Sequence, residues 1–119
     1  MSRARFPRAA RLLHQAEFRR VFQQAERSAD SCFTVLARSN DTGTARLGLA
    51  ISVRRAGNAV RRNRLKRIVR ESFRCHRDHL PPVDLVVMAR PAAATADAAR
   101  LRASLERHWE RLTQRCGSC

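Results

Sequence analysis

Apolar residues recur at helical spacing in three segments of the chain. In residues 12–26 they lie at i, i+3, i+4 and i+7, on one helical face formed by Phe18, Val21, Phe22 and Ala25. A second helix is predicted from Ala59 to His79, with one broad core-facing arc of Leu65, Ile68, Val69, Ser72, Phe73 and His76. A closing helix over residues 95–112, with Thr95 as its expected N-cap, carries the stripe Leu101, Leu105, Trp109 and Leu112.

Strand patterns fill the intervals between these helices. Residues 31–39 alternate about Phe33, Val35 and Ala37, and residues 45–53 form a second apolar run. Because the turn-forming stretch Asn40–Gly43 separates these two strands, we expect them to pair as an antiparallel hairpin. Residues 83–90 are too continuously apolar to alternate, which predicts a buried strand. The order helix, strand, strand, helix, strand, helix predicts an α+β fold in which helices pack on a small sheet of about four strands.

The length of 119 residues fits one domain, 1–119, in which we expect residues 1–11 to be a basic arm and residues 113–119 a flexible tail. Lys and Arg number 25 against 10 Asp and Glu, so the formal net charge is +15. The basic residues concentrate between positions 54 and 77, where Glu71 is the single acid; they are Arg54, Arg55, Arg61, Arg62, Arg64, Lys66, Arg67, Arg70, Arg74 and Arg77. Such a balance favours a polyanionic partner.

The charges of the second helix fall on one face. Opposite the apolar arc, at i, i+4, i+7 and i+11, stand Asn63, Arg67, Arg70 and Arg74, a stripe about 16 Å long. With almost no acids nearby, i,i+4 ion pairs cannot offset the repulsion, so we interpret the stripe as a nucleic-acid surface rather than a solvated face. Aromatic side chains beside such a surface can stack on unpaired bases. The candidates are Phe18, Phe22 and Phe33, for which core positions are the alternative.

Other classes of function have weaker support. No apolar run is long enough for a membrane span or a signal peptide, so we expect a cytoplasmic protein with reduced cysteines and no membrane partner. A zinc site could use Cys116, Cys119, His76 and His79, but there is one CxxC only. The remaining histidines, His14 and His108, are expected to be solvated. The dispersed acids do not suggest a protein nuclease, whereas a ribosome-associated or duplex-binding module stays open.

The stretch "GNAVRRNRLKRIVRESFR", residues 57–74, resembles the protein subunit of bacterial ribonuclease P, whose Arg-Asn-Arg signature would be Arg62-Asn63-Arg64. Similar family segments are "AEFRRVF", "RLGLAISVRR" and "DLVVMAR", so the resemblance covers about residues 8–112. Some members have a tyrosine at the position of Leu36, so this chain lacks that stacking side chain.

The resemblance implies a protein that assists a catalytic RNA in removing the 5′ leader of precursor tRNA. The RNA carries the chemistry, and Mg²⁺ is bound mainly by the RNA and its substrate. We expect no catalytic residue or metal ligand in this chain, no organic cofactor and no obligate protein partner. A mixed sheet with a left-handed strand-helix-strand crossover is also implied. Together with Arg61 and Arg74 from the charge pattern, the expected RNA-binding set is Arg54, Arg55, Arg61, Arg62, Asn63, Arg64, Lys66, Arg67, Arg70 and Arg74. The cleft for the leader would be lined by Phe18, Phe22 and Phe33.

Overall fold

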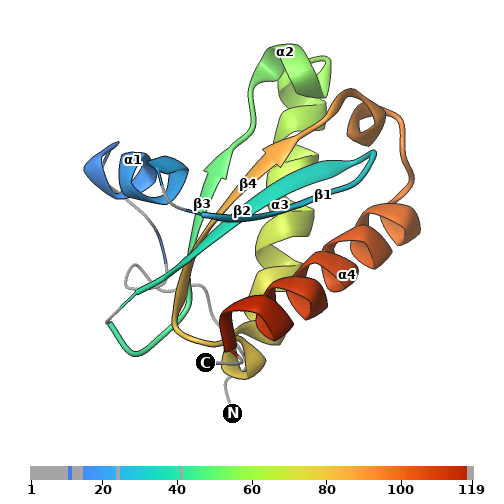
Figure 1. Cartoon of the computed structure of the whole chain (residues 1–119). Coiled ribbons are helices and arrows are strands. Elements are labelled where there is room, and N and C mark those ends of the chain that lie inside the picture. Colours follow the sequence, from blue (N-terminus) through green and yellow to red (C-terminus); the bar gives the residue numbers. More distant parts are fainter. Residues whose placement is uncertain (1–10, 12–14, 24, 41, 118–119) are drawn as a thin grey trace.

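The computed structural model describes residue 11 and residues 15–23, 25–40 and 42–117, without the side chain of residue 116. Figure 1 shows a sheet with helices on both of its faces. Along the chain the elements are α1 (Gln15–Gln23), β1 (Glu26–Ala29), β2 (Phe33–Ser39), β3 (Arg46–Ala50), α2 (Val53–Ala56), α3 (Ala59–His76), the 3-10 turn Arg77–His79, β4 (Val83–Ala89), the 3-10 turn Pro91–Ala94 and α4 (Ala98–Gly117). The predicted α+β class and helix–strand order are confirmed.

The strands form one mixed sheet in the order β1-β2-β4-β3. β2 is antiparallel to both β1 and β4, whereas β3 is parallel to β4. The predicted hairpin between residues 31–39 and 45–53 is therefore wrong, because β4 lies between β2 and β3. β4, the strand with most buried residues, takes an interior position and pairs with a neighbouring strand on each side. β3 and β4 are joined through α2 and α3, which gives a strand-helix-strand crossover; its left-handed sense stays a prediction.

β1 has no counterpart in the hydrophobic pattern. Its four residues, Glu-Arg-Ser-Ala, are mostly polar, so the periodicity extended α1 to residue 26, whereas the helix ends at Gln23. The hairpin that does form joins β1 to β2 through Asp30. Its Oδ1 accepts hydrogen bonds of 2.9 Å from the backbone N–H groups of Cys32 and Phe33, which is turn chemistry typical of aspartate.

One face of the sheet carries the main core, and the other carries α1. Alternate side chains of β2 and β4, such as Val35 and Leu85, pack with α3 and α4 in the main cluster. Val21 of α1 and Val86 of β4 form a second, smaller cluster on the opposite face. The strand period of two thus divides one central sheet between a large core and a helix that covers only part of the other face.

The apolar faces predicted for the long helices are confirmed in the main core. Leu65, Ile68, Val69 and Phe73 of α3 are buried, as are all four predicted residues of α4. Ser72 is partly exposed and accepts a 2.8 Å hydrogen bond from Nε1 of Trp109, whose ring meets Phe73 edge-on at 6.3 Å. The predicted cap Thr95 is replaced by Asp97, whose Oδ1 accepts a 2.8 Å bond from the N–H of Arg100.

His108 is fully buried, so the prediction that it is solvated is wrong. β1 covers it: the Ser28 hydroxyl lies 2.6 Å from its Nδ1, and the Asp30 carboxylate lies 3.3 Å from its Nε2. Burial lowers the pKa of His108, although Asp30 opposes the shift. Burial raises the pKa of Asp30, but hydrogen bonds from Ser104 and the β1–β2 turn outweigh it and hold that pKa below its usual range. The unpredicted strand and this polar cluster fasten α4 to the sheet.

Within the described residues, the helices are too short or too polar to cross a membrane.

Candidate nucleic-acid interface

Two capped turns position α3 against the end of β3. The Ser52 side chain caps α2, and Gly57 follows it with φ of +101°, a left-handed conformation that glycine adopts without strain. Asn58 then caps α3, its Oδ1 accepting a 2.8 Å hydrogen bond from the N–H of Arg61. Nε of Arg62 donates at 2.8 Å to the carbonyl of Ile51. The helix therefore starts at a set distance and orientation from the sheet.

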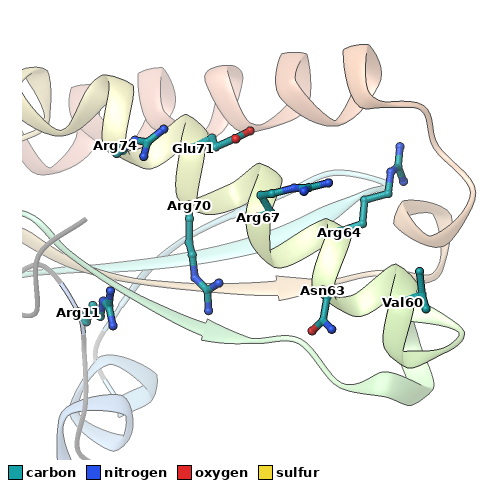
Figure 2. A pocket seen from close by; sticks show the side chains of 8 residues that line it. All are labelled: Arg11, Val60, Asn63, Arg64, Arg67, Arg70, Glu71 and Arg74. Atoms are coloured by element: carbon teal, nitrogen blue, oxygen red, sulfur yellow. The ribbon is translucent and has the colours of Figure 1, made fainter. Parts of the chain in front are cut away.

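A groove of about 740 Å³ runs along the outward side of α3 (Figure 2). It contains the four residues of the predicted stripe, and its lining is Arg11, Val60, Asn63, Arg64, Arg67, Arg70, Glu71 and Arg74. Asn63 and Arg70 project toward the side of α3 on which Arg11 lies. The structure thus brings the predicted stripe together on one accessible surface, five of whose eight side chains are guanidinium groups.

Five of the ten predicted RNA-binding residues lie on α2 and α3 but do not line the groove. Arg54 and Arg55 are exposed on α2, and Arg61 is exposed on the first turn of α3. Arg64 lines the groove while both of its terminal nitrogens lie 3.4 Å from the carbonyl of Ala96. The signature therefore has two roles: Arg62 and Arg64 brace α3 against neighbouring backbone, and Asn63 faces the groove.

The positive side chains of α3 repel one another in the free protein. Burial lowers the pKa of Lys66, and the positive charges of Arg62 and Arg70 on adjacent turns lower it further. No acid stands in the first turn of α3, where the helix dipole is itself positive. Glu71 is the single acid in the groove lining. A bound phosphate would reduce this repulsion. Without one, the buried apolar side chains on the other face of α3 offset it and keep the helix folded.

The open face of the sheet carries a partly apolar surface beside α1. Phe18 packs against the small cluster with Ala25, Leu36 and Met88. Phe22 is 48% exposed, which is unusual for a large aromatic side chain and leaves its ring free to stack. Phe18 and Phe22 lie one helical turn apart on α1, and their role as cleft residues stays a prediction.

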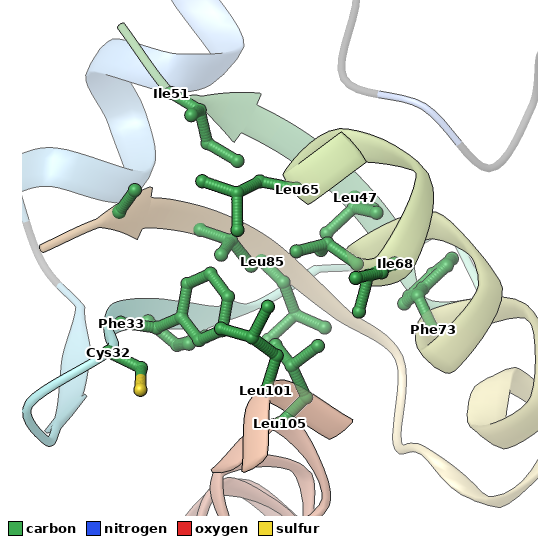
Figure 3. Packing of buried hydrophobic residues seen from close by; sticks show 14 of the residues in the cluster. Cys32, Phe33, Leu47, Ile51, Leu65, Ile68, Phe73, Leu85, Leu101 and Leu105 are labelled. Atoms are coloured by element: carbon green, nitrogen blue, oxygen red, sulfur yellow. The ribbon is translucent and has the colours of Figure 1, made fainter. Parts of the chain in front are cut away.

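Phe33 does not join them. It is 0% exposed and belongs to the main core with Leu101 and Leu105, on the α4 side of the sheet (Figure 3). Odd-numbered residues of β2 point to the core and even-numbered ones to α1, so Leu36, not Phe33, reaches the open face. The expected group of three phenylalanines is corrected to Phe18 and Phe22.

Three residues beside these surfaces, Arg11, Val60 and Arg46, were not among the predicted site residues. Arg11 enters the groove because residue 11 makes a parallel bridge to Leu47, a long-range pairing that no local pattern indicates. Val60 is 79% exposed in the groove, and its spacing of three residues from Asn63 and seven from Arg67 agrees with a place on the outward side of α3. On the open face, Arg46 joins Asp84 through two 2.8 Å contacts and Glu17 through one, which ties α1 to two strands.

Clusters of three or more His, Cys, Asp or Glu side chains able to hold a metal ion do not occur in the described part of the chain. Two of the four residues of the zinc alternative, the side chain of Cys116 and all of Cys119, lie outside that part. His76 uses Nδ1 in a 2.8 Å contact with the Ser72 carbonyl of its own helix.

The chain is similar to known proteins over nearly its whole length. A family profile described as Ribonuclease P matches residues 6–113. The ribonuclease P protein component of Thioalkalivibrio sulfidiphilus is 54% identical over 113 residues, which is 95% of this chain and 94% of that protein. That of Methylococcus capsulatus is 52% identical over 93% of this chain and 87% of that protein. Among solved structures, the RNase P protein of Staphylococcus aureus matches with a TM-score of 0.80 and 33% identity, over 88% of this chain and 95% of that one. The RNase P protein from Thermotoga maritima matches with a TM-score of 0.76 and 33% identity, over 85% and 96%.

Proposed function

Because the chain belongs to the ribonuclease P protein family, we propose that it binds a catalytic RNA and the 5′ leader of precursor tRNA, and so assists removal of that leader in the cytoplasm. The observation that carries this proposal is the groove on α3, where five arginines and Asn63 share one accessible surface. A surface of this charge has little use in a protein that meets no polyanion.

The α3 groove is the proposed contact with the catalytic RNA. Guanidinium groups recognise phosphate oxygens through paired N–H donors, and their charge does not titrate near neutral pH. The stripe from Asn63 to Arg74 covers about 16 Å of helix, enough to meet several successive phosphates. Each phosphate contacted releases condensed counterions, so affinity should fall steeply with salt.

The surface beside α1 is the proposed contact with the leader. Phe22 offers an exposed ring, and Phe18 supports it from the partly buried side. A single-stranded leader has unpaired bases, which stack on aromatic rings without regard to sequence. Leu36 supplies apolar surface there but no ring.

The proposed chemistry belongs to the RNA. Mg²⁺ would be held by the catalytic RNA and the substrate, since Glu17 and Asp84, acids of the open face, are already engaged by Arg46. The contribution of this chain is electrostatic: its arginines reduce repulsion between two RNA molecules, which raises substrate affinity and lowers the Mg²⁺ concentration that cleavage requires.

Reconstitution tests the proposal directly. The purified chain is mixed with the ribonuclease P RNA of the same organism and a precursor tRNA at low Mg²⁺, and maturation of the tRNA 5′ end is measured. We expect cleavage only when both chain and RNA are present. Cleavage by the protein alone would indicate a protein nuclease instead. Binding to structured RNA without any stimulation of 5′ maturation would favour a ribosome-associated or duplex-binding module.

A further inference from the structure

A second basic hollow lies on the open face of the sheet, separate from the α3 groove. Its volume is about 350 Å³, and it is lined by Arg20, Arg38, Ser39, Asn40, Arg46 and Asp84. These residues come from α1, the end of β2, the start of β3 and the start of β4. Three arginines in one hollow invite the question of which charges neutralise them.

Arg46 binds both carboxylates near the hollow, those of Asp84 and Glu17. Its Nε and one terminal nitrogen contact the two oxygens of Asp84 at 2.8 Å, and its other terminal nitrogen contacts Glu17 at 2.8 Å. Asn40 donates a further 2.7 Å bond to Asp84. The Asp84 side chain is 6% exposed, so this carboxylate is both buried and engaged. It has little capacity left for another cation.

Arg38 and Arg20 consequently have no carboxylate partner within the described residues. Arg38 lies directly across from Asp84 in the β2–β4 pairing, yet its side chain donates to the backbone carbonyl of Arg20 at 3.1 Å. That bond fixes the position of the guanidinium without neutralising it, and leaves further N–H donors for a ligand. The Arg20 side chain is exposed and makes no hydrogen bond or ion pair that involves described residues. Three arginines and the carboxylates of Asp84 and Glu17 together carry a net charge of +1, although both carboxylates are bound by Arg46.

α1 separates this hollow from the aromatic surface. Phe18 and Phe22 lie one helical turn apart, whereas Arg20 lies on the other flank of the helix, about 160° around the axis from each. On the sheet below, Met88 lies beside the aromatic flank and Asp84, four residues earlier in β4, lies in the basic hollow. The open face is thus divided by α1 into an apolar flank and a basic flank.

We propose that the hollow at Arg20 and Arg38 is a second RNA-binding site, which holds a phosphodiester group on the flank of α1 opposite Phe22. A guanidinium held by a backbone carbonyl is preorganised for a phosphate, and the Ser39 hydroxyl adds a neutral donor at the rim. The net charge of +1 matches the single negative charge of one phosphodiester. The site rests on the proposed function, because it takes the same class of partner, and it adds a contact remote from α3. RNA bound there would reach α1 from the side away from the aromatic surface.

Paired variants of α1 test the site. Arg20→Ala removes the side chain that lines the hollow and keeps the backbone carbonyl that Arg38 needs. Arg19→Ala removes the same charge from the adjacent exposed position of α1, which does not line the hollow. Arg38→Gln removes charge and retains an amide donor for the Arg20 carbonyl. Melting temperatures establish that each variant is folded.

Dissociation constants are measured from 0.1 to 0.4 M salt, with the ribonuclease P RNA in one titration and with precursor and mature tRNA bound by the assembled holoenzyme in others. Loss of one phosphate contact at a slope of about 0.9 corresponds to about an 8-fold weaker affinity at 0.1 M salt. We expect Arg20→Ala and Arg38→Gln to show this loss and a salt slope lower by about one with at least one RNA, and Arg19→Ala to show less than half of it. A loss of affinity for the ribonuclease P RNA would assign the bound phosphate to that RNA. A loss of affinity for precursor tRNA but not for mature tRNA would assign it to the leader. Equal behaviour of Arg20→Ala and Arg19→Ala with every RNA would overturn the inference. Loss of affinity on substituting Arg67 and Arg70 in the same titrations would show that the proposed function stands even then.

Discussion

Simultaneous substitution of Arg67 and Arg70 by alanine should weaken RNA binding in a way that depends on salt. Both side chains are exposed in the α3 groove and their Cα atoms are about 4.5 Å apart along the helix axis, so each can serve a different phosphate. Two lost contacts lower the salt slope by about 1.8. The corresponding loss in affinity is about 60-fold at 0.1 M salt, or about 2.4 kcal/mol, and about 5-fold at 0.4 M.

The same substitutions should not harm folding. Alanine is the better helix former, and the change removes like charges three and four residues apart on a helix whose face carries Lys66, Arg70 and Arg74. The melting temperature of the double variant should therefore equal or exceed that of the unchanged protein. A loss of binding accompanied by a higher melting temperature separates function from stability.

The assay is a titration of labelled ribonuclease P RNA at four or more salt concentrations, with Arg90→Ala plus Arg102→Ala as the control. Those two arginines are exposed and lie outside the α3 groove, so the control removes the same net charge. If the two double variants gave the same slope of log affinity against log salt concentration, the assignment of the phosphate contacts to α3 would be refuted. A drop in affinity that is unchanged at 0.4 M would refute the counterion argument itself.

Three further predictions concern the open face and the core. Phe22→Ala should weaken binding of leader-carrying precursor by about 1–3 kcal/mol while mature tRNA is unaffected, and equal losses for both RNAs would exclude stacking by the half-exposed ring. Asp84→Asn should lower the free energy of unfolding by about 3 kcal/mol in urea titrations, because the largely buried Arg46 then keeps only Glu17 as an acidic partner among the described residues. A loss below about 1 kcal/mol would mean that water, not Asp84, stabilises the Arg46 charge. The free energy of unfolding should fall as pH drops below 6.5, with a slope of at most about 1.4 kcal/mol per pH unit. The reason is that His108 takes up a proton in the unfolded chain at a higher pH than it does when buried in the folded protein. His108→Gln should flatten this slope, and an unchanged pH profile would contradict the argument.

The helices were predictable because their information is local. Apolar residues at i, i+3 and i+4 must share a face, so the core contacts of Leu65, Val69 and Phe73 follow from spacing alone. The basic stripe is predictable for the same reason, since Asn63 to Arg74 belong to one helix and the side opposite its core is accessible. Asn58 as N-cap is a similarly local feature.

The sheet was less predictable because strand pairing is not local. Residues 31–39 and 45–53 are adjacent in sequence and joined by a good turn, yet β4 separates them, since the strand with most buried residues is best placed in the interior of the sheet. β1 is short and polar, and it forms because its backbone can pair with β2 and its Ser28 can meet His108. The family resemblance placed Phe33 in the cleft, and the sequence could not correct this because it shows that a strand alternates without showing which side faces which helix.

The chain's own sequence therefore determines the α+β class, the family, the three amphipathic helices α1, α3 and α4, and the charged face of α3. Each is a property of residues within one segment or one motif. Tertiary structure decides which flank of α1 is aromatic and which is basic, how Arg11 reaches the α3 groove, and why Arg38 remains without a carboxylate while Arg46 has two. Those features depend on side chains from three or four segments meeting across strands, and the energies that choose one pairing over another are summed over the whole packed molecule.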